Sequence, residues 1–268
     1  MKAILPPAPD FERQIDLRRS EKPHTLPHPY GDCMNWQATE INPLERIIVA
    51  LDVSRGEEAL ALARKLAPHR SPLKIGLQLY TGAGPEIVNA LRDLGVRIFL
   101  DLKLHDIPNT VARAVESAGS LGVEMLTLHL HGGRAMIEAA VRAAPPGLLL
   151  LGVTVLTSVD EISLRETGVS SSIADQVLRL TKLGVESGIG GIVASPLELR
   201  SLRHAFGTKI KIVTPGIRPA GAAVNDQKRT LTPGEAVRAG ADFLVVGRPI
   251  TSAKDPRAAL EQIAADAV

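Results

Sequence analysis

We predict an α/β protein with a single (β/α)8, or TIM, barrel from three observations. Short apolar runs alternate with amphipathic segments along most of the 268 residues, and strands that alternate with helices pair in parallel. Eight such units follow one another, which is the number that closes this barrel. Polar residues gather where the apolar runs end, and the active sites of such barrels lie at the carboxyl ends of the strands.

The eight apolar runs are predicted to be the strands. They are Ile47–Val53, Leu73–Leu77, Val96–Lys103, Val123–His129, Leu148–Leu156, Gly191–Ala194, Lys211–Thr214 and Phe243–Gly247. Only 3% of the chain is aromatic. The body of the chain is therefore expected to pack mostly with Val, Ile, Leu and Ala, which suits a barrel interior filled by branched aliphatic side chains.

The segments that follow the runs have the apolar spacing of helices that bury one face. They are Glu57–Leu66, Pro85–Leu94, Val111–Leu121, Ala135–Ala144, Ile173–Glu186, Pro196–Phe206, Pro233–Ala239 and Pro256–Ala267. Several open with proline, which the first helical turn tolerates. A doubly wound sheet is the alternative architecture, but it needs a glycine-rich turn after the first strand, and residues 51–58 do not supply one.

Residues 1–43 are predicted to form an N-terminal extension that is poorly ordered or draped over the surface. They hold seven of the 19 prolines and show no sustained periodicity. Segments of this kind have little apolar surface to bury. The remaining residues, 44–268, are expected to form one barrel domain.

Composition and charge limit the partners and the compartment. The net charge is +2, which is too small an excess for a protein that binds nucleic acid or a membrane surface. No run approaches the about 20 apolar residues that span a bilayer, and the first nine residues lack the apolar core of a signal peptide. The single cysteine, Cys33, suits a reducing compartment. A cytoplasmic protein is expected.

The segment Asp101-Leu-Lys-Leu-His-Asp-Ile-Pro-Asn-Thr110 ends the third predicted strand and is the most informative of the chain. Side chains two apart on a strand share a face, so Asp101 and Lys103 are expected to point the same way, with Asp106 close behind. Nearby carboxylates favour the protonated form of a lysine. Such a group is a good proton donor for a reaction that creates negative charge on carbon. A lone Asp-x-Lys pair also fits a surface ion pair worth about 0–1 kcal/mol.

Polar residues at the other strand ends extend this site. Lys74 lies inside an apolar strand, where an ammonium group needs a partner, and Asp101 would provide one. We therefore expect an alternating array of Lys74, Asp101, Lys103 and Asp106. Asp52 ends the first strand and equally suits capping the next helix.

The last two strands are followed by a predicted phosphate site. Pro215-Gly-Ile-Arg218 and Val246-Gly-Arg248 stand where such barrels bind phosphate. Glycine lets backbone N–H groups approach the oxygens, and arginine offers a bidentate donor. Between them, residues 216–231 lack periodicity, which is typical of a disordered segment or a functional lid.

His129 and His131 raise the alternative of a metal site at the fourth strand. Only one of the two faces the barrel unless the strand bends, and Lys74 would repel a cation. No metal and no other cofactor is expected. His105 is interpreted as structural, because the adjacent charges already supply a proton.

The segment 101–110 resembles the signature of the orotidine 5′-phosphate decarboxylase family, in its bacterial form. Further matching segments occur in the same order, and the resemblance runs from about Asn42 to the C-terminus. They are Val49–Asp52, Leu73–Gly76, Val155–Ser158, Pro215–Arg218, Asn225–Gln227 and Val245–Arg248. The resemblance implies cofactor-free decarboxylation of orotidine 5′-monophosphate to UMP, the last step of de novo pyrimidine nucleotide biosynthesis.

The resemblance also implies a role for each site residue. Lys103 would donate the proton, and Asp101 would face the substrate carboxylate. In a homodimer, Asp106 and Thr110 would reach into the neighbouring subunit's site. The substrate contacts would come from Asp52 and Lys74 at the ribose, Thr157 and Ser158 at the pyrimidine, and Arg218, Gln227, Gly247 and Arg248 at the phosphate.

Two other functions are weighed beside this one. A sugar-phosphate decarboxylase or aldolase of the same barrel type shares an Asp-x-Lys-x-x-Asp core but uses a metal. A catalytically silent phosphoribosyl-binding sensor would not need a lysine poised between carboxylates.

Overall fold

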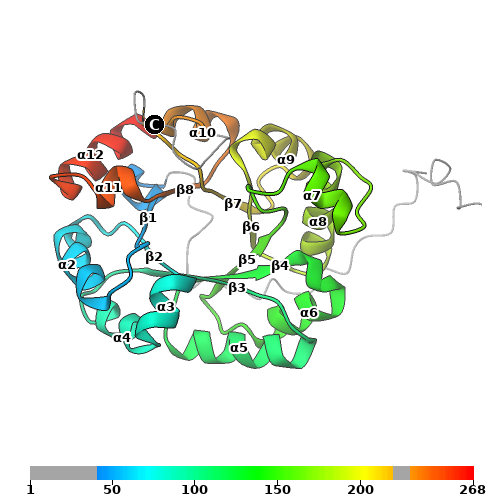
Figure 1. The fold of residues 1–268 in the computed structure, drawn as a ribbon, viewed down its shortest axis with the longest axis horizontal. Helices are drawn as coiled ribbons and strands as arrows, with labels where there is room; N and C mark the ends of the chain where they lie inside the picture. Colours follow the sequence, from blue (N-terminus) through cyan, green and yellow to red (C-terminus); the bar gives the residue numbers. More distant parts are fainter. Residues whose placement is uncertain (1–40, 220–229) are drawn as a thin grey trace, which may run out of the picture.

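The computed structural model describes residues 41–219 and 230–268, which form a closed barrel of eight parallel strands (Figure 1). The strands pair in chain order, and β8 closes the barrel against β1. They are β1 (Ile47–Ala50), β2 (Leu73–Gly76), β3 (Ile98–Leu104), β4 (Met125–His129), β5 (Leu149–Val153), β6 (Gly191–Val193), β7 (Lys211–Thr214) and β8 (Phe243–Val246). The (β/α)8 prediction is confirmed, although most strands are shorter than the apolar runs.

Helices surround the barrel, and each predicted helix has a counterpart (Figure 1). The counterparts are α2 (Gly56–Leu66), α4 (Glu86–Arg92), α5 (Pro108–Ser120), α6 (Gly133–Ala143), α8 (Ile173–Glu186), α9 (Leu199–Phe206), α10 (Pro233–Ala239) and α12 (Pro256–Asp266). None of the helices in the described part of the chain is long and apolar enough to cross a membrane.

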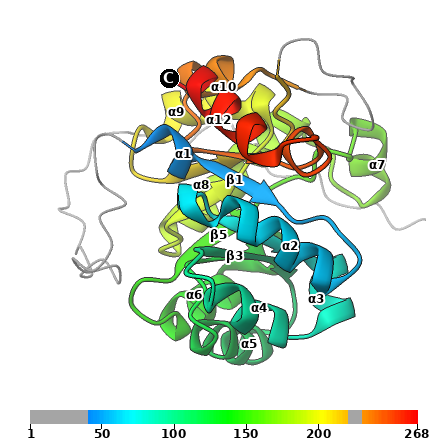
Figure 2. The same ribbon diagram turned by 90° about the vertical axis from the view of Figure 1, so that its left-hand side faces the viewer.

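Short helices were not predicted, because one or two turns are too few to show a period. They are α1 (Pro43–Arg46), α3 (Leu77–Ala83), α7 (Glu161–Glu166) and α11 (Arg248–Thr251), with the 3-10 turns η1 (Ala67–His69) and η2 (Leu130–Gly132). The 3-10 turn η3 (Pro196–Glu198) forms the first part of the predicted helix Pro196–Phe206 and leads directly into α9. Figure 2 shows α1 at the amino end of β1, whereas α3 and α7 lie at the opposite end of the barrel.

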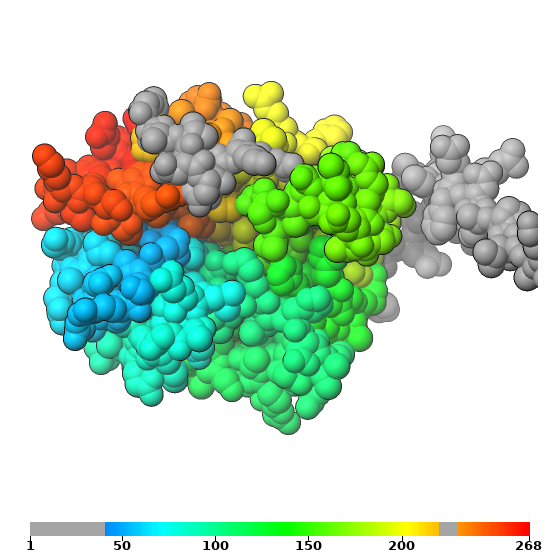
Figure 3. All heavy atoms as spheres, in the orientation of Figure 1, coloured from blue at the N-terminus to red at the C-terminus, as the bar shows by residue number. Residues whose placement is uncertain are grey.

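The chain before the barrel is described only from Ile41. Asn42 caps α1 by accepting a hydrogen bond from the Leu44 N–H at 3.0 Å. Residues 1–40 of the predicted extension lie outside the described residues. The first and last strands, β1 and β8, pair with each other. Figure 3 shows that the blue start and the red end of the described chain also meet on the surface.

The core packs mostly with aliphatic side chains, as expected. One apolar cluster gathers residues on the inner faces of the strands, and a larger one fills the space between strands and helices. The inner cluster consists of Ile48, Phe99, Met125, Leu149, Leu151, Val213 and Phe243. Two aromatic side chains, Phe99 and Phe243, each 1% exposed, thus share the barrel interior with the aliphatic ones.

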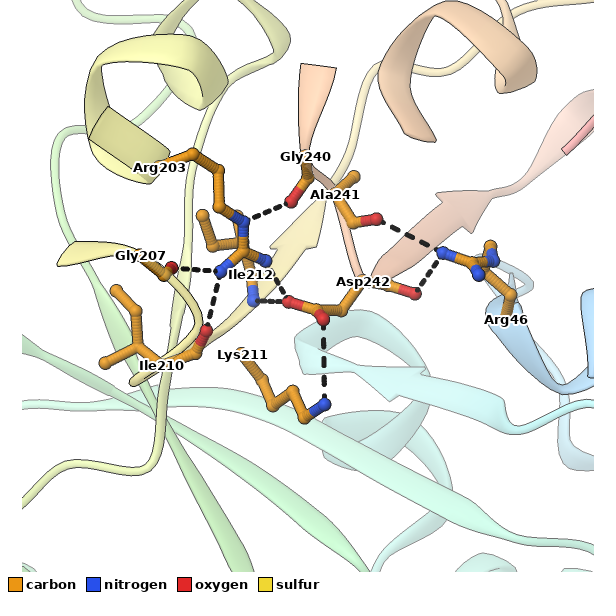
Figure 4. Close-up of polar contacts among 9 residues, drawn as sticks. All are labelled: Arg46, Arg203, Gly207, Ile210, Lys211, Ile212, Gly240, Ala241 and Asp242. Carbon is orange, nitrogen blue, oxygen red and sulfur yellow. Dashed lines mark hydrogen bonds and ion pairs between the residues drawn. The ribbon is translucent and has the colours of Figure 1, made fainter. Parts of the chain in front are cut away.

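Arg203, on α9, ties together the amino ends of β7 and β8 (Figure 4). Its side chain is 19% exposed and forms an ion pair with Asp242, which is equally buried. Asp242 also accepts from the Ile212 N–H at 2.7 Å and lies 3.6 Å from Lys211 Nζ. The guanidinium donates to three carbonyl oxygens at 2.6–2.9 Å, those of Gly207, Ile210 and Gly240.

We expect Arg203→Met to lower the free energy of unfolding by about 3–5 kcal/mol, because it leaves a half-buried carboxylate and three carbonyls short of partners. The apparent Tm should fall by about 2–4 °C per kcal/mol in a thermal unfolding experiment. Arg200→Met, an exposed position on the same helix, is the matched control and should leave Tm nearly unchanged. Equal Tm values for both variants would show that the network does not stabilise the barrel.

Candidate active site

Four charged side chains form a continuous line across the carboxyl ends of β1, β2 and β3. Lys74 Nζ lies 3.1 Å from Asp52 Oδ1 and 3.5 Å from Asp101 Oδ2. Lys103 Nζ lies 2.8 Å from Asp101 Oδ1. The structure thus brings together Lys74, Asp101 and Lys103 as the sequence predicts, and Asp52 adds a carboxylate at the open end.

The line is buried at its centre. The side chains of Lys74 and Asp101 are 10% and 13% exposed, whereas those of Lys103 and Asp52 are 29% and 64% exposed. Gly76 leaves the room for Lys74, because a Cβ there would lie 3.1 Å from its Nζ. Opposite charges therefore alternate along the line, with Lys74 and Asp101 buried at its centre and with Asp52 and Lys103 accessible to a ligand at its two ends.

The Asp101 carboxyl is held in its ionised form. Burial acts to raise its pKa, but the charges of Lys74 and Lys103, with hydrogen bonds from Lys103 and Thr127, outweigh burial and leave the pKa below its usual value. The ionised group stabilises the folded barrel above the usual carboxyl pKa. That contribution is lost as the pH falls through the lowered pKa.

The backbone of β3 is irregular at Lys103. Its φ is +51°, in the left-handed region, and the register between β3 and β4 shifts between Leu100 and Leu104. A non-glycine residue in this region stores about 1–3 kcal/mol of strain. The side chains of Asp101 and Lys103 meet as expected, but regular strand alternation, on which that expectation rested, does not hold at Lys103. A uniform strand period in the sequence gives no sign of this bulge.

Thr127, on β4, is a site residue that sequence reasoning missed. Its Oγ1 accepts a hydrogen bond from the Lys103 N–H at 2.8 Å and donates one to Asp101 Oδ1 at 2.9 Å. The residue is fully buried. The available signal was a hydroxyl inside an otherwise apolar strand, of the same kind that singled out Lys74.

Asp106 does not flank Lys103 within one chain. Its Oδ1 accepts from the Ile107 N–H at 2.6 Å, and no ion pair between Asp106 and Lys103 is present among the residues described. Residues 105–110, with Thr110 at the first turn of α5, are all exposed, and Ile107 is 67% exposed. The fourth member of the expected array is therefore missing from the single-chain site.

Thr157 and Ser158 lie in an exposed turn between β5 and α7. The turn is closed by a hydrogen bond from the Val159 N–H to the Leu156 carbonyl at 2.9 Å. Both hydroxyls therefore stand at the carboxyl end of the barrel, on the end that carries the charged line.

The predicted phosphate residues follow β7 and β8. Ile217 pairs with Leu231, and the Arg218 N–H donates to the Leu231 carbonyl at 3.0 Å, so the two ends of the predicted lid lie together. Gly247 lies beside Asp52, since a Cβ there would be 3.7 Å from the carboxylate oxygen. Arg248 is exposed and begins α11. Gln227 lies outside the described residues.

The three histidines lie near one another because the chain bends after β4. The rings of His105 and His129 are 5.6 Å apart, and those of His129 and His131 are 6.4 Å apart. Burial, followed by the nearby charges of His105, His131 and Lys103, holds the pKa of His129 below its usual value. Within residues 41–219 and 230–268, no three His, Cys, Asp or Glu side chains are grouped so that they could hold a metal ion.

This geometry defines a (β/α)8-barrel enzyme with a partly exposed lysine beside a buried carboxylate and basic residues after the last two strands. The chain belongs to the orotidine 5′-phosphate decarboxylase / HUMPS family, whose model matches residues 45–263.

Individual relatives agree with this assignment. Orotidine 5′-phosphate decarboxylases of Opitutus terrae and of Anaeromyxobacter sp. strain K are each 51% identical to this chain. The first match covers 82% of this chain and 97% of the relative, and the second covers 84% and 99%. A crystal structure of orotidine 5′-phosphate decarboxylase from Lactobacillus acidophilus superposes with a TM-score of 0.75 at 39% identity, covering 83% of this chain and 99% of that one.

Proposed function

We propose that this chain decarboxylates orotidine 5′-monophosphate to UMP without a cofactor, as the last step of de novo pyrimidine nucleotide biosynthesis. The observation that carries the proposal is the contact between Asp101 and Lys103 at the mouth of the barrel. Relatives that are 51% identical and bear the name of this enzyme support it. The barrel of residues 44–268 is the catalytic domain, and the single Cys33 suits a cytoplasmic location.

The reaction breaks the bond between C6 of the pyrimidine and its carboxylate. The electron pair stays on C6, and CO₂ leaves. The Lys103 ammonium stabilises this developing charge and then donates its proton to C6. Asp101 faces the substrate carboxylate, which disfavours the bound ground state, and its 2.8 Å contact orients Lys103.

The remaining site residues bind the rest of the nucleotide. Lys74 and Asp52 hold the ribose hydroxyls, and Thr157 and Ser158 read the pyrimidine edge. The phosphate is bound by Arg218, Gln227, Gly247 and Arg248.

Decarboxylation of orotidine 5′-monophosphate by the purified protein tests the proposal directly. We expect turnover that persists in excess chelator. Turnover of a sugar phosphate that chelator abolishes would support the metal-dependent alternative, and UMP binding without any turnover would support a sensor.

We further propose that a homodimer is the catalytic unit, with Asp106 and Thr110 completing the partner's site. Within one chain, Asp106 lies outside the charged line although it belongs to the same segment. The exposed run 105–110, with the apolar Ile107 67% exposed, offers surface for a second subunit.

Mixing two inactive proteins should restore activity if the site is shared. Lys103→Ala and Asp106→Ala each disable every site of their own homodimers. A mixed dimer holds one site with neither lesion, so equal mixing should restore about a quarter of the wild-type turnover for random two-fold pairing. The measurement is turnover before and after verified subunit exchange. An absence of rescue after exchange would show that Asp106 does not act across the interface.

A further inference from the structure

The Thr127 hydroxyl both donates and accepts a hydrogen bond within the charged line. A hydroxyl has one proton to donate, and Thr127 donates it to Asp101 Oδ1 at 2.9 Å. Its oxygen accepts from the backbone N–H of Lys103 at 2.8 Å. The same Asp101 oxygen accepts from Lys103 Nζ at 2.8 Å. Both ends of Lys103 are thereby joined to one carboxylate oxygen through a closed ring of three hydrogen bonds.

We propose that Thr127 is a positioning residue for the decarboxylation, which fixes the Lys103 backbone and the Asp101 carboxylate relative to each other. The inference rests on the proposed function. Thr127 itself is fully buried and acts through the two groups that it binds.

The backbone of Lys103 needs this partner. The register shift between Leu100 and Leu104 takes the Lys103 N–H out of the regular ladder with β4. Its left-handed φ of +51° is strained for a lysine and persists only where the surroundings enforce it. The Thr127 hydroxyl replaces the backbone acceptor that a regular strand would supply, so it holds the lysine in the conformation that aims Nζ at Asp101.

The Asp101 carboxylate also needs the hydrogen bond from Thr127. Asp101 Oδ2 faces Lys74 at 3.5 Å, while Oδ1 receives both Lys103 and Thr127. A carboxylate between two ammonium groups can rotate and share its oxygens differently. The bond from Thr127 fixes which oxygen faces which lysine, and it helps to keep the carboxyl ionised.

Thr127 also lies at the right depth. It follows Met125 on the inner face of β4, as Asp101 follows Phe99 on β3, so it joins the layer of polar side chains directly above the apolar interior. Packing alone would be satisfied by a valine of the same shape. The hydroxyl is therefore explained by its two hydrogen bonds.

Two substitutions separate the hydroxyl from the shape. Thr127→Val keeps the shape and removes both bonds, whereas Thr127→Ser keeps the hydroxyl and loses a methyl group. We expect Thr127→Val to lower kcat for orotidine 5′-monophosphate by about 100-fold, with a much smaller change in KM, because a small misplacement of reacting groups has effects of this size. Ser should remain within several-fold of wild type.

The pH profile provides a second measurement. Val removes a hydrogen bond to the ionised Asp101, so the acid limb of kcat/KM should move to higher pH relative to wild type. Thr127→Ser should leave the acid limb at its wild-type pH. Thr181→Val is the control, because Thr181 is also fully buried and its hydroxyl has no partner among the described residues. If Val does not fold, Thr127→Ala removes the same bonds and takes its place.

Inactive wild-type protein would overturn the proposed function and this inference with it. With an active wild type, a Val variant that equals wild type in kcat and pH profile would overturn the inference alone. A Ser variant that loses as much kcat as Val would also overturn it, since shape rather than the hydroxyl would then matter. The inference would be supported if Thr127→Val loses kcat while Thr127→Ser and the Thr181→Val control retain it.

Discussion

Lys103→Ala abolishes the decarboxylation of orotidine 5′-monophosphate, while the barrel still folds and still binds UMP. The loss in kcat should reach at least about 10²–10⁴-fold, which is what a positioned general acid contributes. Lys103 is 29% exposed and in contact with Asp101, so it is the ammonium group that can meet both a substrate and the carboxylate. Lys74 is the alternative donor, but its Nζ lies between Asp52 and Asp101 and is only 10% exposed.

Further substitutions at this position separate charge, proton transfer and fold. Lys103→Arg keeps the positive charge but cannot release a proton, so it should also be inactive. Lys103→Gly should be more stable than Lys103→Ala by about 1–2 kcal/mol, because glycine adopts a positive φ without strain. Lys182→Ala, a 71% exposed lysine on α8, is the control and should keep full activity. More than a few per cent of wild-type turnover in Lys103→Ala would show that another group donates the proton.

The fold could be predicted because its signals are local and repeated. Eight apolar runs with amphipathic segments between them determine the strand and helix order, and parallel pairing then determines the barrel. Strand ends were placed too far along where an apolar run continues into a turn or a helix, as Leu77 does into α3. Leucine suits either structure, so composition does not mark the point at which the backbone turns.

The site was predictable only as far as it follows strand ends. Lys74 and Asp101 lie on adjacent strands, so their contact follows from topology. The register shift at Lys103 and the two hydrogen bonds of Thr127 depend on one another. Neither leaves a periodic pattern in the sequence from which it could be predicted. The proposed role of Asp106 requires a second subunit, whose position follows from no strand or helix period of the single chain.

Arg248→Ala should lower kcat/KM for orotidine 5′-monophosphate by about 100-fold or more, the effect expected for losing charged hydrogen bonds to a phosphate. Arg248 is exposed at the start of α11, beyond the end of β8. Gly247, its neighbour, lies next to Asp52, at the end of the charged line that is proposed to hold the ribose. The proposed phosphate contact is therefore next to the Asp52 end of the charged line, whereas Lys103, the proposed proton donor, is at its other end.

Binding energy from a remote group can drive closure and orientation, so its loss should lower kcat as well as affinity. Orotidine without its phosphate should accordingly react orders of magnitude more slowly, even at saturation.

Comparing orotidine 5′-monophosphate with the bare nucleoside makes the Arg248 experiment specific for the phosphate contact. Arg248→Ala should leave the rate with the bare nucleoside nearly unchanged, because the nucleoside makes no phosphate contact to lose. Arg257→Ala, on the exposed side of α12, is the control and should affect neither substrate. Equal losses on nucleotide and nucleoside would mean that Arg248 supports the fold or the chemistry directly. A loss confined to the nucleotide assigns Arg248 to the phosphate, because only that substrate presents one.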